Sequence, residues 1–133
     1  MAYRKKSKYH SKKITREGVT FDSIKEYKRF RELSLLERAG EISDLKRQVP
    51  FELIPAQFEE IPTGEIYKRG ERKGQPKFKR VCVEQSVKYV ADFVYSDKYG
   101  KICVEDTKGF KTTDYIIKRK LMLHVHGIKI KEI

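Results

Sequence analysis

The sequence predicts an α/β domain with a central mixed β-sheet flanked by helices, in the order α-β-β-β-α-β. Two segments have helical spacing of apolar residues and a capping residue at each end. The chain between them is rich in valine and tyrosine and is divided by proline and glycine. A length of 133 residues fits one such domain, which we place at residues 18–133.

The first predicted helix is the segment DSIKEYKRFRELSLLERAG, residues 22–40. Asp22 or Ser23 is suited to cap its start and Gly40 to end it. Its apolar residues recur on one side at Ile24, Tyr27, Phe30, Leu33 and Leu36. This spacing indicates a helix that packs one face on the sheet.

Four stretches follow that are typical of strands. QVPFELI and AQFEEI (48–54 and 56–61) are separated by Pro55, and RVCVEQSVKYVADFVYS (80–96) is either one long strand or a bent pair. KYGKICVEDTKG (98–109) follows a turn at Ser96–Gly100, so we expect it to pair antiparallel with the strand before it. Cys82 and Cys103 lie beside valines in these runs and are predicted to be buried, reduced thiols.

The second predicted helix is TTDYIIKRKLMLHVHG, residues 112–127. Thr112 or Thr113 is suited to cap its start, and Gly127 to end it. The alternating segment IKIKEI (128–133) then predicts a last strand.

Cations outnumber anions by 31 to 19, which gives a formal net charge of +12 and indicates a polyanionic partner. No apolar run approaches the ~20 residues of a membrane-spanning helix, so we expect no membrane partner and a cytoplasmic protein. The cations form two clusters, a disordered or extended arm at residues 1–17 and a mobile basic loop at about 62–80. The candidate nucleic-acid contacts in them are Arg4, Lys5, Lys6, Lys8, Lys12, Lys13, Lys68, Arg69, Arg72 and Lys73.

Charged residues also occur inside the apolar strands. Alternation along the strand 102–108 puts Asp106 and Lys108 on one face and Glu105 on the other. Asp92 is the only charge in the run YVADFVY, and the predicted turn makes its strand the neighbour of Asp106. Two carboxylates on a half-buried surface repel each other unless a proton or a cation lies between them, and Mg²⁺ is a suitable cation.

Two further residues extend this pattern. The Lys108 ammonium is suited to hold an attacking water or to neutralise charge that develops on a phosphate, which indicates phosphodiester hydrolysis. Glu26 shares a helix face with Phe30 and Leu33, so it is expected to point towards the sheet, where it could bind a second metal ion.

Asp92, the motif Asp106-Thr107-Lys108 on the next strand and the helix that follows resemble the PD-(D/E)XK nuclease superfamily. Glu26 is similar to the extra acid of its phage resolvase and exonuclease branches. More closely, YVADFVY, VEDTKGFKT and KRKLM resemble a family of small phage-encoded proteins placed in that superfamily. The resemblance covers residues 18–133. It departs from the common motif at Ala91, where proline is usual, and at Asp106, where glutamate is commoner.

This resemblance implies a restriction-endonuclease-like core and a magnesium-dependent nuclease, with Mn²⁺ able to substitute for Mg²⁺. The implied metal ligands are Glu26, Asp92, Asp106 and the carbonyl of Thr107, with Lys108 at the water. Resemblance to resolvases further implies branched DNA such as a Holliday junction as substrate, and a homodimer. Its pairing surface would be the segment KIKEI or the first helix.

Each assignment has a structural alternative. Asp106 and Lys108 could form an exposed cross-strand pair with Glu105 as the acid that matters, and Asp92 could be satisfied by backbone amides. Glu26 could pair with Arg29 or with the Lys/Arg-rich face of its own helix. Tyr115 and Lys118, one turn apart on the second helix, are either a phosphate contact or a core residue and a solvated one. The alternative function is a non-enzymatic basic protein that binds nucleic acid. Inward carboxylates argue against it, because they would repel a polyanion.

Overall fold

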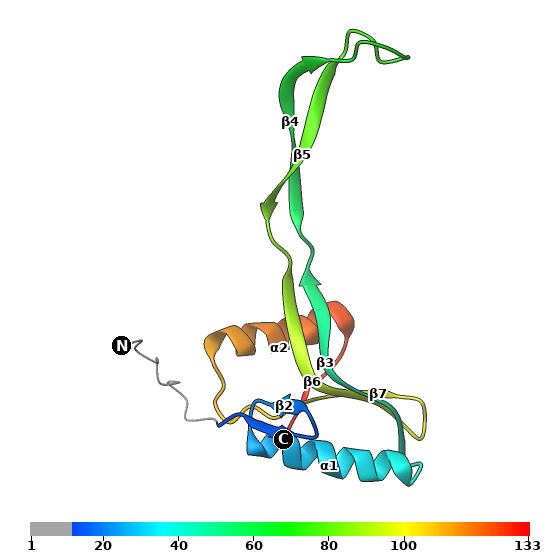
Figure 1. The fold of residues 1–133 in the computed structure, drawn as a ribbon, viewed down its shortest axis with the longest axis vertical. Coiled ribbons are helices and arrows are strands. Elements are labelled where there is room, and N and C mark those ends of the chain that lie inside the picture. Colours follow the sequence, from blue (N-terminus) through cyan, green and yellow to red (C-terminus); the bar gives the residue numbers. More distant parts are fainter. Residues whose placement is uncertain (1–11) are drawn as a thin grey trace, which may run out of the picture. The chain divides into compact units, whose positions relative to one another are not determined.

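A computed structural model describes residues 12–133 of the chain (Figure 1). The elements are β1 (Ile14–Arg16), β2 (Val19–Phe21), α1 (Ile24–Arg38), β3 (Ile42–Ile54), β4 (Gln57–Ile66), β5 (Pro76–Glu84), β6 (Val87–Asp97), β7 (Ile102–Asp106), α2 (Thr113–His126) and β8 (Lys131–Glu132). The fold is therefore α/β, as predicted. Neither helix of the described residues is long and apolar enough to cross a membrane.

The described chain divides into two compact units. Residues 12–51 and 89–133 form the first, which we call the core unit, and Glu52–Lys88 form the second, the hairpin unit. The sequence predicted one domain with a basic loop. The difference arises because the two strands that flank the loop pair with each other and not with the central sheet.

The central sheet has the strand order β3-β6-β7-β8. β6 and β7 are antiparallel, with Phe93 opposite Glu105 and Tyr95 opposite Cys103, whereas β7 and β8 are parallel. The sheet is therefore mixed, and the predicted antiparallel pairing across the turn at residues 98–100 is confirmed. Asp97 closes this turn by accepting the backbone N–H groups of Tyr99 and Lys101 at 2.8 and 2.9 Å.

The helices lie on opposite sides of this sheet (Figure 1). The Ser23 hydroxyl caps α1, and Leu33 on its inner face packs with Phe93 and Tyr95 of β6. Thr112 caps α2, and Gly127 ends it with a φ of 66°, a backbone conformation that glycine adopts without strain. Both predicted helices and their caps are therefore confirmed.

A short hairpin precedes α1 and was not predicted. Ile14–Arg16 pairs antiparallel with Val19–Phe21, so the part of the predicted arm that the structure describes includes a strand. Phe21 is buried, and its ring lies 5.3 Å from that of Phe30 on α1. The hairpin is thereby attached to the first helix.

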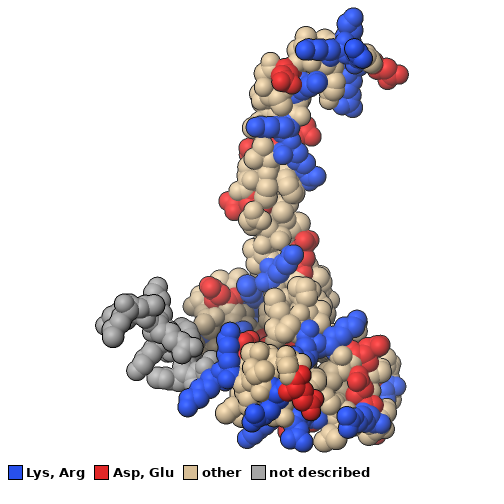
Figure 2. Space-filling model, in the orientation of Figure 1, with Lys and Arg blue, Asp and Glu red and all other residues tan. Residues whose placement is uncertain are grey.

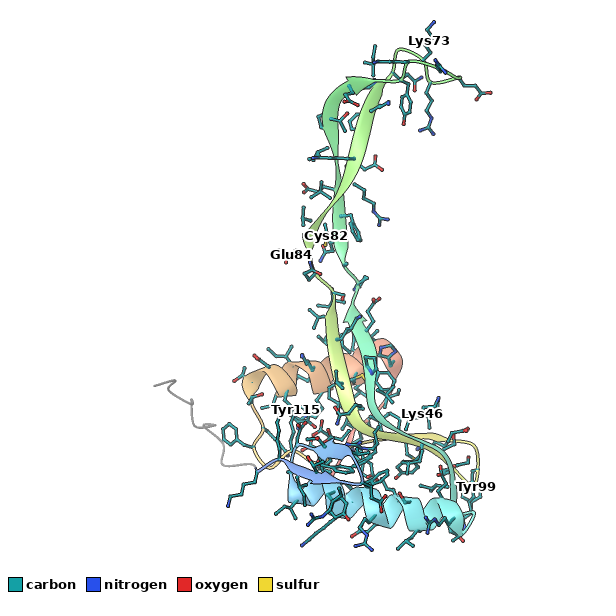
Figure 3. All side chains as sticks on the ribbon, in the orientation of Figure 1. Lys46, Lys73, Cys82, Glu84, Tyr99 and Tyr115 are labelled. Atoms are coloured by element: carbon teal, nitrogen blue, oxygen red, sulfur yellow. The ribbon has the colours of Figure 1, made fainter. Side chains whose placement is uncertain are left out.

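The hairpin unit contains β4 and β5. Their register places Phe58 opposite Cys82 and Pro62 opposite Phe78, so the predicted loop at 62–80 is shortened to the turn segment 67–75. Figure 3 marks Lys73 in this turn segment and Cys82 near the other end of β5. The prediction of a buried Cys82 is wrong, since this strand has a partner on one side only and Cys82 is exposed.

Candidate functional site

A cleft of about 490 Å³ lies in the core unit between the start of α1, strand β6 and the segment that joins β7 to α2. Its lining residues are Asp22, Ser23, Lys25, Glu26, Asp92, Thr107, Lys108, Gly109, Phe110 and Thr112. Residues from distant parts of the chain thus meet at one cavity, and they include most of the site predicted from the sequence.

Glu26 is positioned by the way α1 begins. Its backbone N–H donates to the Ser23 hydroxyl at 3.1 Å, and its carboxylate Oε2 accepts the Asp22 N–H at 2.9 Å. This exchange is similar to a capping box, which fixes a glutamate at the first turn of a helix. Only 1% of Glu26 is exposed, so the carboxylate is buried at the edge of the cleft as the helical spacing predicted.

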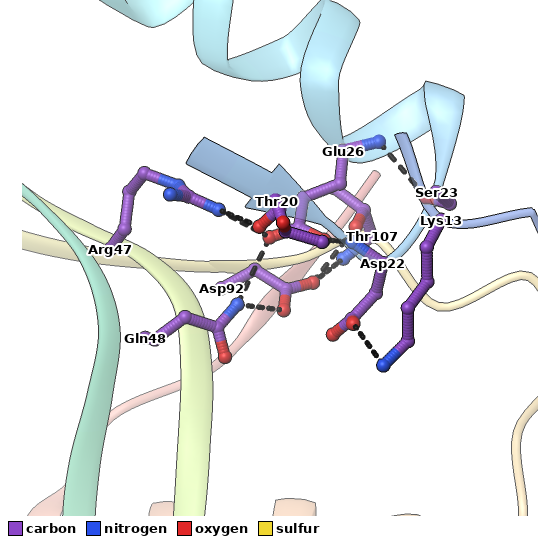
Figure 4. Close-up of polar contacts among 9 residues, drawn as sticks. All are labelled: Lys13, Thr20, Asp22, Ser23, Glu26, Arg47, Gln48, Asp92 and Thr107. Carbon is purple, nitrogen blue, oxygen red and sulfur yellow. Dashed lines mark hydrogen bonds and ion pairs between the residues drawn. The ribbon is translucent and has the colours of Figure 1, made fainter. Parts of the chain in front are cut away.

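Asp92 on β6 faces the same cleft (Figure 4). Its Oδ2 accepts the backbone N–H and the hydroxyl of Thr107 at 2.9 and 2.8 Å. The amide of Gln48 reaches the other oxygen, Oδ1, at 3.3 Å. The structural alternative, in which a backbone amide donates a hydrogen bond to Asp92, therefore applies to Oδ2 and not to Oδ1.

Asp106 ends β7, immediately before the cleft residues Thr107 and Lys108; it is 1% exposed and does not itself line the cleft. Its Oδ2 accepts the Tyr89 hydroxyl at 2.7 Å, and its Oδ1 accepts the Lys108 N–H at 3.0 Å. The Lys108 ammonium lies 3.9 Å from Oδ2 and 5.1 Å from the centre of the Tyr115 ring. Since 42% of the Lys108 side chain is exposed, its ammonium is open to a ligand in the cleft.

The negative charge of Asp92 repels the carboxylates of Glu26 and Asp106. Burial raises the pKa of Glu26 and of Asp106 above their ordinary values, and the charge of Asp92 raises both further. The pKa of Asp106 stays raised although the Tyr89 hydroxyl and Lys108 act in the opposite direction. A cation in the cleft would relieve this repulsion.

Glu105 lies in a different environment from its neighbour Asp106. It is fully buried and accepts two hydrogen bonds from Arg29, at 2.8 and 2.6 Å, and one from the Tyr95 hydroxyl at 2.6 Å. Burial alone would raise the pKa of Glu105, but these hydrogen bonds outweigh it and lower the pKa. Glu105 is therefore part of a buried ion pair outside the cleft, and Arg29 pairs with it and not with Glu26.

The predicted basic contacts are spread over both units. Lys12 and Lys13 are exposed, and the Lys13 ammonium lies 4.0 Å from Asp22 at the cleft. Lys118 lies half-buried on α2. Lys68, Arg69, Arg72 and Lys73 are exposed in the turn segment of the hairpin unit, where Figure 2 shows a concentration of basic side chains. Arg4, Lys5, Lys6 and Lys8 lie outside the described residues.

Three residues at the site were not predicted. Gln48 and Arg47 on β3 both contact Glu26 Oε1, at 3.0 and 3.4 Å, and Tyr89 contacts Asp106. Tyr89 alternates with Ala91 and Phe93 in the sequence, and this pattern indicates burial but not its partner. For Gln48 the sequence contains no signal, because its position depends on a left-handed backbone (φ 52°) inside a strand.

The carboxylate oxygens at the cleft are ligands of the kind that a hard cation such as Mg²⁺ prefers. Carboxylates with a raised pKa supply the oxygen ligands that Mg²⁺ prefers, and Mg²⁺ requires only one or two of them besides waters. Within residues 12–133, however, no group of three or more acids, histidines or cysteines converges closely enough to hold an ion. Donors of the protein itself lie between the acids instead, and the Gln48 amide spans Glu26 and Asp92.

Comparison with known proteins identifies the family to which the chain belongs. Residues 6–132 match the family described as "Protein of unknown function (DUF1064)", and because the match covers nearly the whole chain, the chain belongs to this family. No curated protein and no solved structure matches it.

Proposed function

We propose that this protein is a magnesium-dependent endonuclease that hydrolyses phosphodiester bonds of DNA. The observation that carries the proposal is the convergence of Glu26, Asp92 and Lys108 on one cleft, with the Asp106 carboxylate 3.9 Å from the Lys108 ammonium. Acids that repel one another inside a protein with a net charge of +12 are difficult to explain as phosphate binders, and they suit a metal ion that itself binds phosphate.

Glu26, Asp92, Asp106 and the Thr107 carbonyl are the residues that would hold Mg²⁺ or Mn²⁺. When bound, the ion would supply Lewis-acid polarisation of the phosphate and a water of lowered pKa. The protein itself contributes fixed geometry. The Thr107 N–H and hydroxyl orient Asp92, the Asp22 N–H orients Glu26, and the Tyr89 hydroxyl orients Asp106.

Lys108 has a separate role in this proposal. Its backbone N–H is held by Asp106 at 3.0 Å, whereas its ammonium is partly exposed at the cleft. The ammonium can therefore contact a phosphate oxygen or the attacking water and offset the negative charge of the transition state.

The finer assignment of the fold is part of the proposal. A mixed sheet with an acid on each of two antiparallel strands, a lysine two residues after the second acid and helices on both faces supports a restriction-endonuclease-like core of the PD-(D/E)XK type. The buried glutamate in the first turn of α1 supports the same assignment.

Carboxamide variants of the acids and an alanine variant of Lys108 test the proposed chemistry. Asp92→Asn, Asp106→Asn and Lys108→Ala should each lower Mg²⁺-dependent cleavage of plasmid DNA by several powers of ten, with DNA binding in Ca²⁺ nearly unchanged. Asp44→Asn is the matched control, since Asp44 is an exposed aspartate outside the cleft. Full Mg²⁺-dependent activity of Asp106→Asn would refute the assignment.

We further propose branched DNA as the preferred substrate and a homodimer as the active form. Two cuts are needed to resolve a four-way junction, and α1 exposes the apolar side chains of Leu35 and Leu36, which a second copy could cover. A four-way junction should bind at least ~10-fold more tightly than linear duplex, a difference of about 1.4 kcal/mol. Equal affinities measured for a monomeric protein would contradict this part of the proposal.

One observation favours the alternative of a non-enzymatic nucleic-acid binder. The acids already accept hydrogen bonds from the protein, as structural carboxylates do. The two functions differ in their response to metal: a binder would leave linear, single-stranded and junction DNA intact in Mg²⁺, in Mn²⁺ and in chelator alike, whereas a nuclease would cleave at least one of them only with metal.

A further inference from the structure

Gln48 lies at the point where Glu26 and Asp92 approach each other. Its side-chain Nε2 donates to Glu26 Oε1 at 3.0 Å and to Asp92 Oδ1 at 3.3 Å (Figure 4). A primary amide has two N–H donors at one end and a carbonyl acceptor at the other. Because both neighbours are carboxylate oxygens, only the NH₂ end can face them.

The backbone of Gln48 is unusual as well. Its φ of 52° is left-handed, although β3 continues on both sides of it. A residue other than glycine is strained in such a conformation, and strain of this kind is concentrated at functional sites. The strained backbone accompanies a side chain that reaches both acids, from a strand that supplies neither of them.

The remaining oxygens of the two acids have other partners. Glu26 Oε2 is bound by the Asp22 N–H, and Asp92 Oδ2 by Thr107. Gln48 therefore contacts the two oxygens that face each other, Oε1 of Glu26 and Oδ1 of Asp92. Arg47 also reaches Glu26 Oε1, at 3.4 Å, but it makes no hydrogen bond to Asp92 among the contacts of the described residues. Gln48 is the group that bridges them.

We propose that the Gln48 amide is a positioning group that occupies the place of a divalent cation between Glu26 and Asp92 and turns aside when a cation binds. The inference rests on the proposed function. In the absence of an ion, the two N–H groups offset the repulsion between the carboxylates and keep both oxygens aimed at one point. A bound cation would face the positive end of the amide dipole, so the amide must rotate. Because Gln48 is exposed, nothing around it prevents this rotation.

This role is compatible with the finding that no group of three or more acids, histidines or cysteines converges on one point in the described residues, because the amide bridges only two acids. It also predicts competition, because the ion must displace two hydrogen bonds before it can bind. The amide would thereby lower the affinity of the site for a cation while preserving the geometry of its ligands.

The variant Gln48→Gly tests the competition directly. Glycine adopts the left-handed backbone without strain, so the variant should fold, and it removes the side chain that carries the amide. Titration calorimetry with Mn²⁺ on the full chain should give a dissociation constant about 10-fold lower than that of the unaltered protein. The isosteric Gln48→Glu replaces the donor with a third carboxylate and should show the largest rise in melting temperature on addition of Mn²⁺.

The control is Asp44→Gly, which relieves a φ of 54° in the same strand at a residue outside the cleft. It should leave Mn²⁺ affinity unchanged. An unchanged or higher dissociation constant in Gln48→Gly would overturn the role of Gln48 and leave the proposed nuclease function standing. If the unaltered protein bound neither Mn²⁺ nor Mg²⁺, the proposed function itself would fall, and the role of Gln48 with it.

Discussion

The core unit and the hairpin unit differ in how many hydrophobic side chains they bury. Of the eleven buried hydrophobic residues in the described chain, only Leu53 belongs to the hairpin unit. Large apolar side chains of β4 and β5 are instead exposed, at Phe58, Ile66, Phe78 and Val83. Since an isolated two-stranded hairpin is marginally stable in water, packing within the hairpin unit contributes little stability, whereas the core unit is stabilised by its own packing.

The two units also differ in whether their charged side chains are buried or exposed. The core unit buries Glu26, Glu105 and Asp106. In the hairpin unit, residues 67–80 carry seven lysines and arginines against one acid, Glu71, and nearly all of them are exposed. Under the proposed function, catalysis would use the desolvated charges of the core unit, and attraction of DNA would use the solvated charges of the hairpin unit.

The largest expected effect is on the stability of the core unit. Glu105→Ala leaves Arg29 and the Tyr95 hydroxyl without their buried acceptor, and it should lower the free energy of unfolding by about 3 kcal/mol in urea denaturation. The stabilisation should also depend on pH. Because the folded-state pKa of Glu105 is lowered, its contribution is complete above the unfolded-state pKa and is lost as the pH falls through the folded-state value.

The control for this variant replaces both charges. Glu105→Leu combined with Arg29→Met removes the ion pair without leaving either charge alone, so it should recover much of the stability. A decrease below about 1 kcal/mol in Glu105→Ala would mean that the pair contributes no more than an exposed one.

The next effect concerns the hairpin unit. Replacement of Lys68, Arg69, Arg72 and Lys73 by glutamine should weaken duplex binding more than ~10-fold at moderate salt. It should also reduce the slope of log affinity against log salt by about 0.9 for each DNA phosphate that the protein no longer neutralises. Fluorescence anisotropy over a salt series measures both. Unfolding of the core unit should be unaffected.

The matched control removes the same charge from the core unit. Lys28, Arg31, Arg38 and Lys46 belong to that unit and lie outside the cleft, and their replacement by glutamine should change the salt slope less. Equal effects of the two sets would show that DNA responds to net charge alone, and the two units would then not differ in DNA binding.

The smallest effect is a gain in stability at the cleft. Because the pKa of Asp106 is raised in the folded protein, ionisation of Asp106 disfavours folding as the pH rises above the unfolded-state pKa. Asp106→Asn removes this penalty and should raise the melting temperature at pH 7 by a few degrees, with little gain at pH 3. A lower melting temperature at pH 7 would show that Asp106 is a stabilising residue, as Glu105 is.

Much of the core unit could be predicted from local sequence. The apolar spacing and caps around Leu33 and Gly127 define the helices, and the turn before Lys101 makes Asp92 and Asp106 residues of neighbouring strands. Alternation along β7 then separates Glu105 from Asp106. These features depend on residues a few positions apart, for which side-chain direction follows from helix and strand geometry alone.

What could not be predicted depends on distant partners. Arg29 and Glu105 are 76 residues apart, and Gln48 reaches Asp92 across 44. The apolar alternation around Val83 is typical of a half-buried strand, and it does not reveal that the only neighbour of β5 in the described chain is β4. The sequence therefore indicates which residues lie on a strand face but not what covers that face.

Glu105 and Asp106 are consecutive residues with opposite shifts in pKa, one bound by a cation and the other crowded by an anion. A single residue inserted or removed between Lys101 and Val104 would change both environments. An insertion would move Glu105 to the strand position that Asp106 now occupies, and a deletion would move Asp106 to the position that now faces Arg29. Loop insertions are usually tolerated because the strands beside them keep their register. Here a change in the register of β7 would also change the groups with which each carboxylate interacts. Under the proposed function, the length of this strand would therefore be constrained as strictly as the acids themselves.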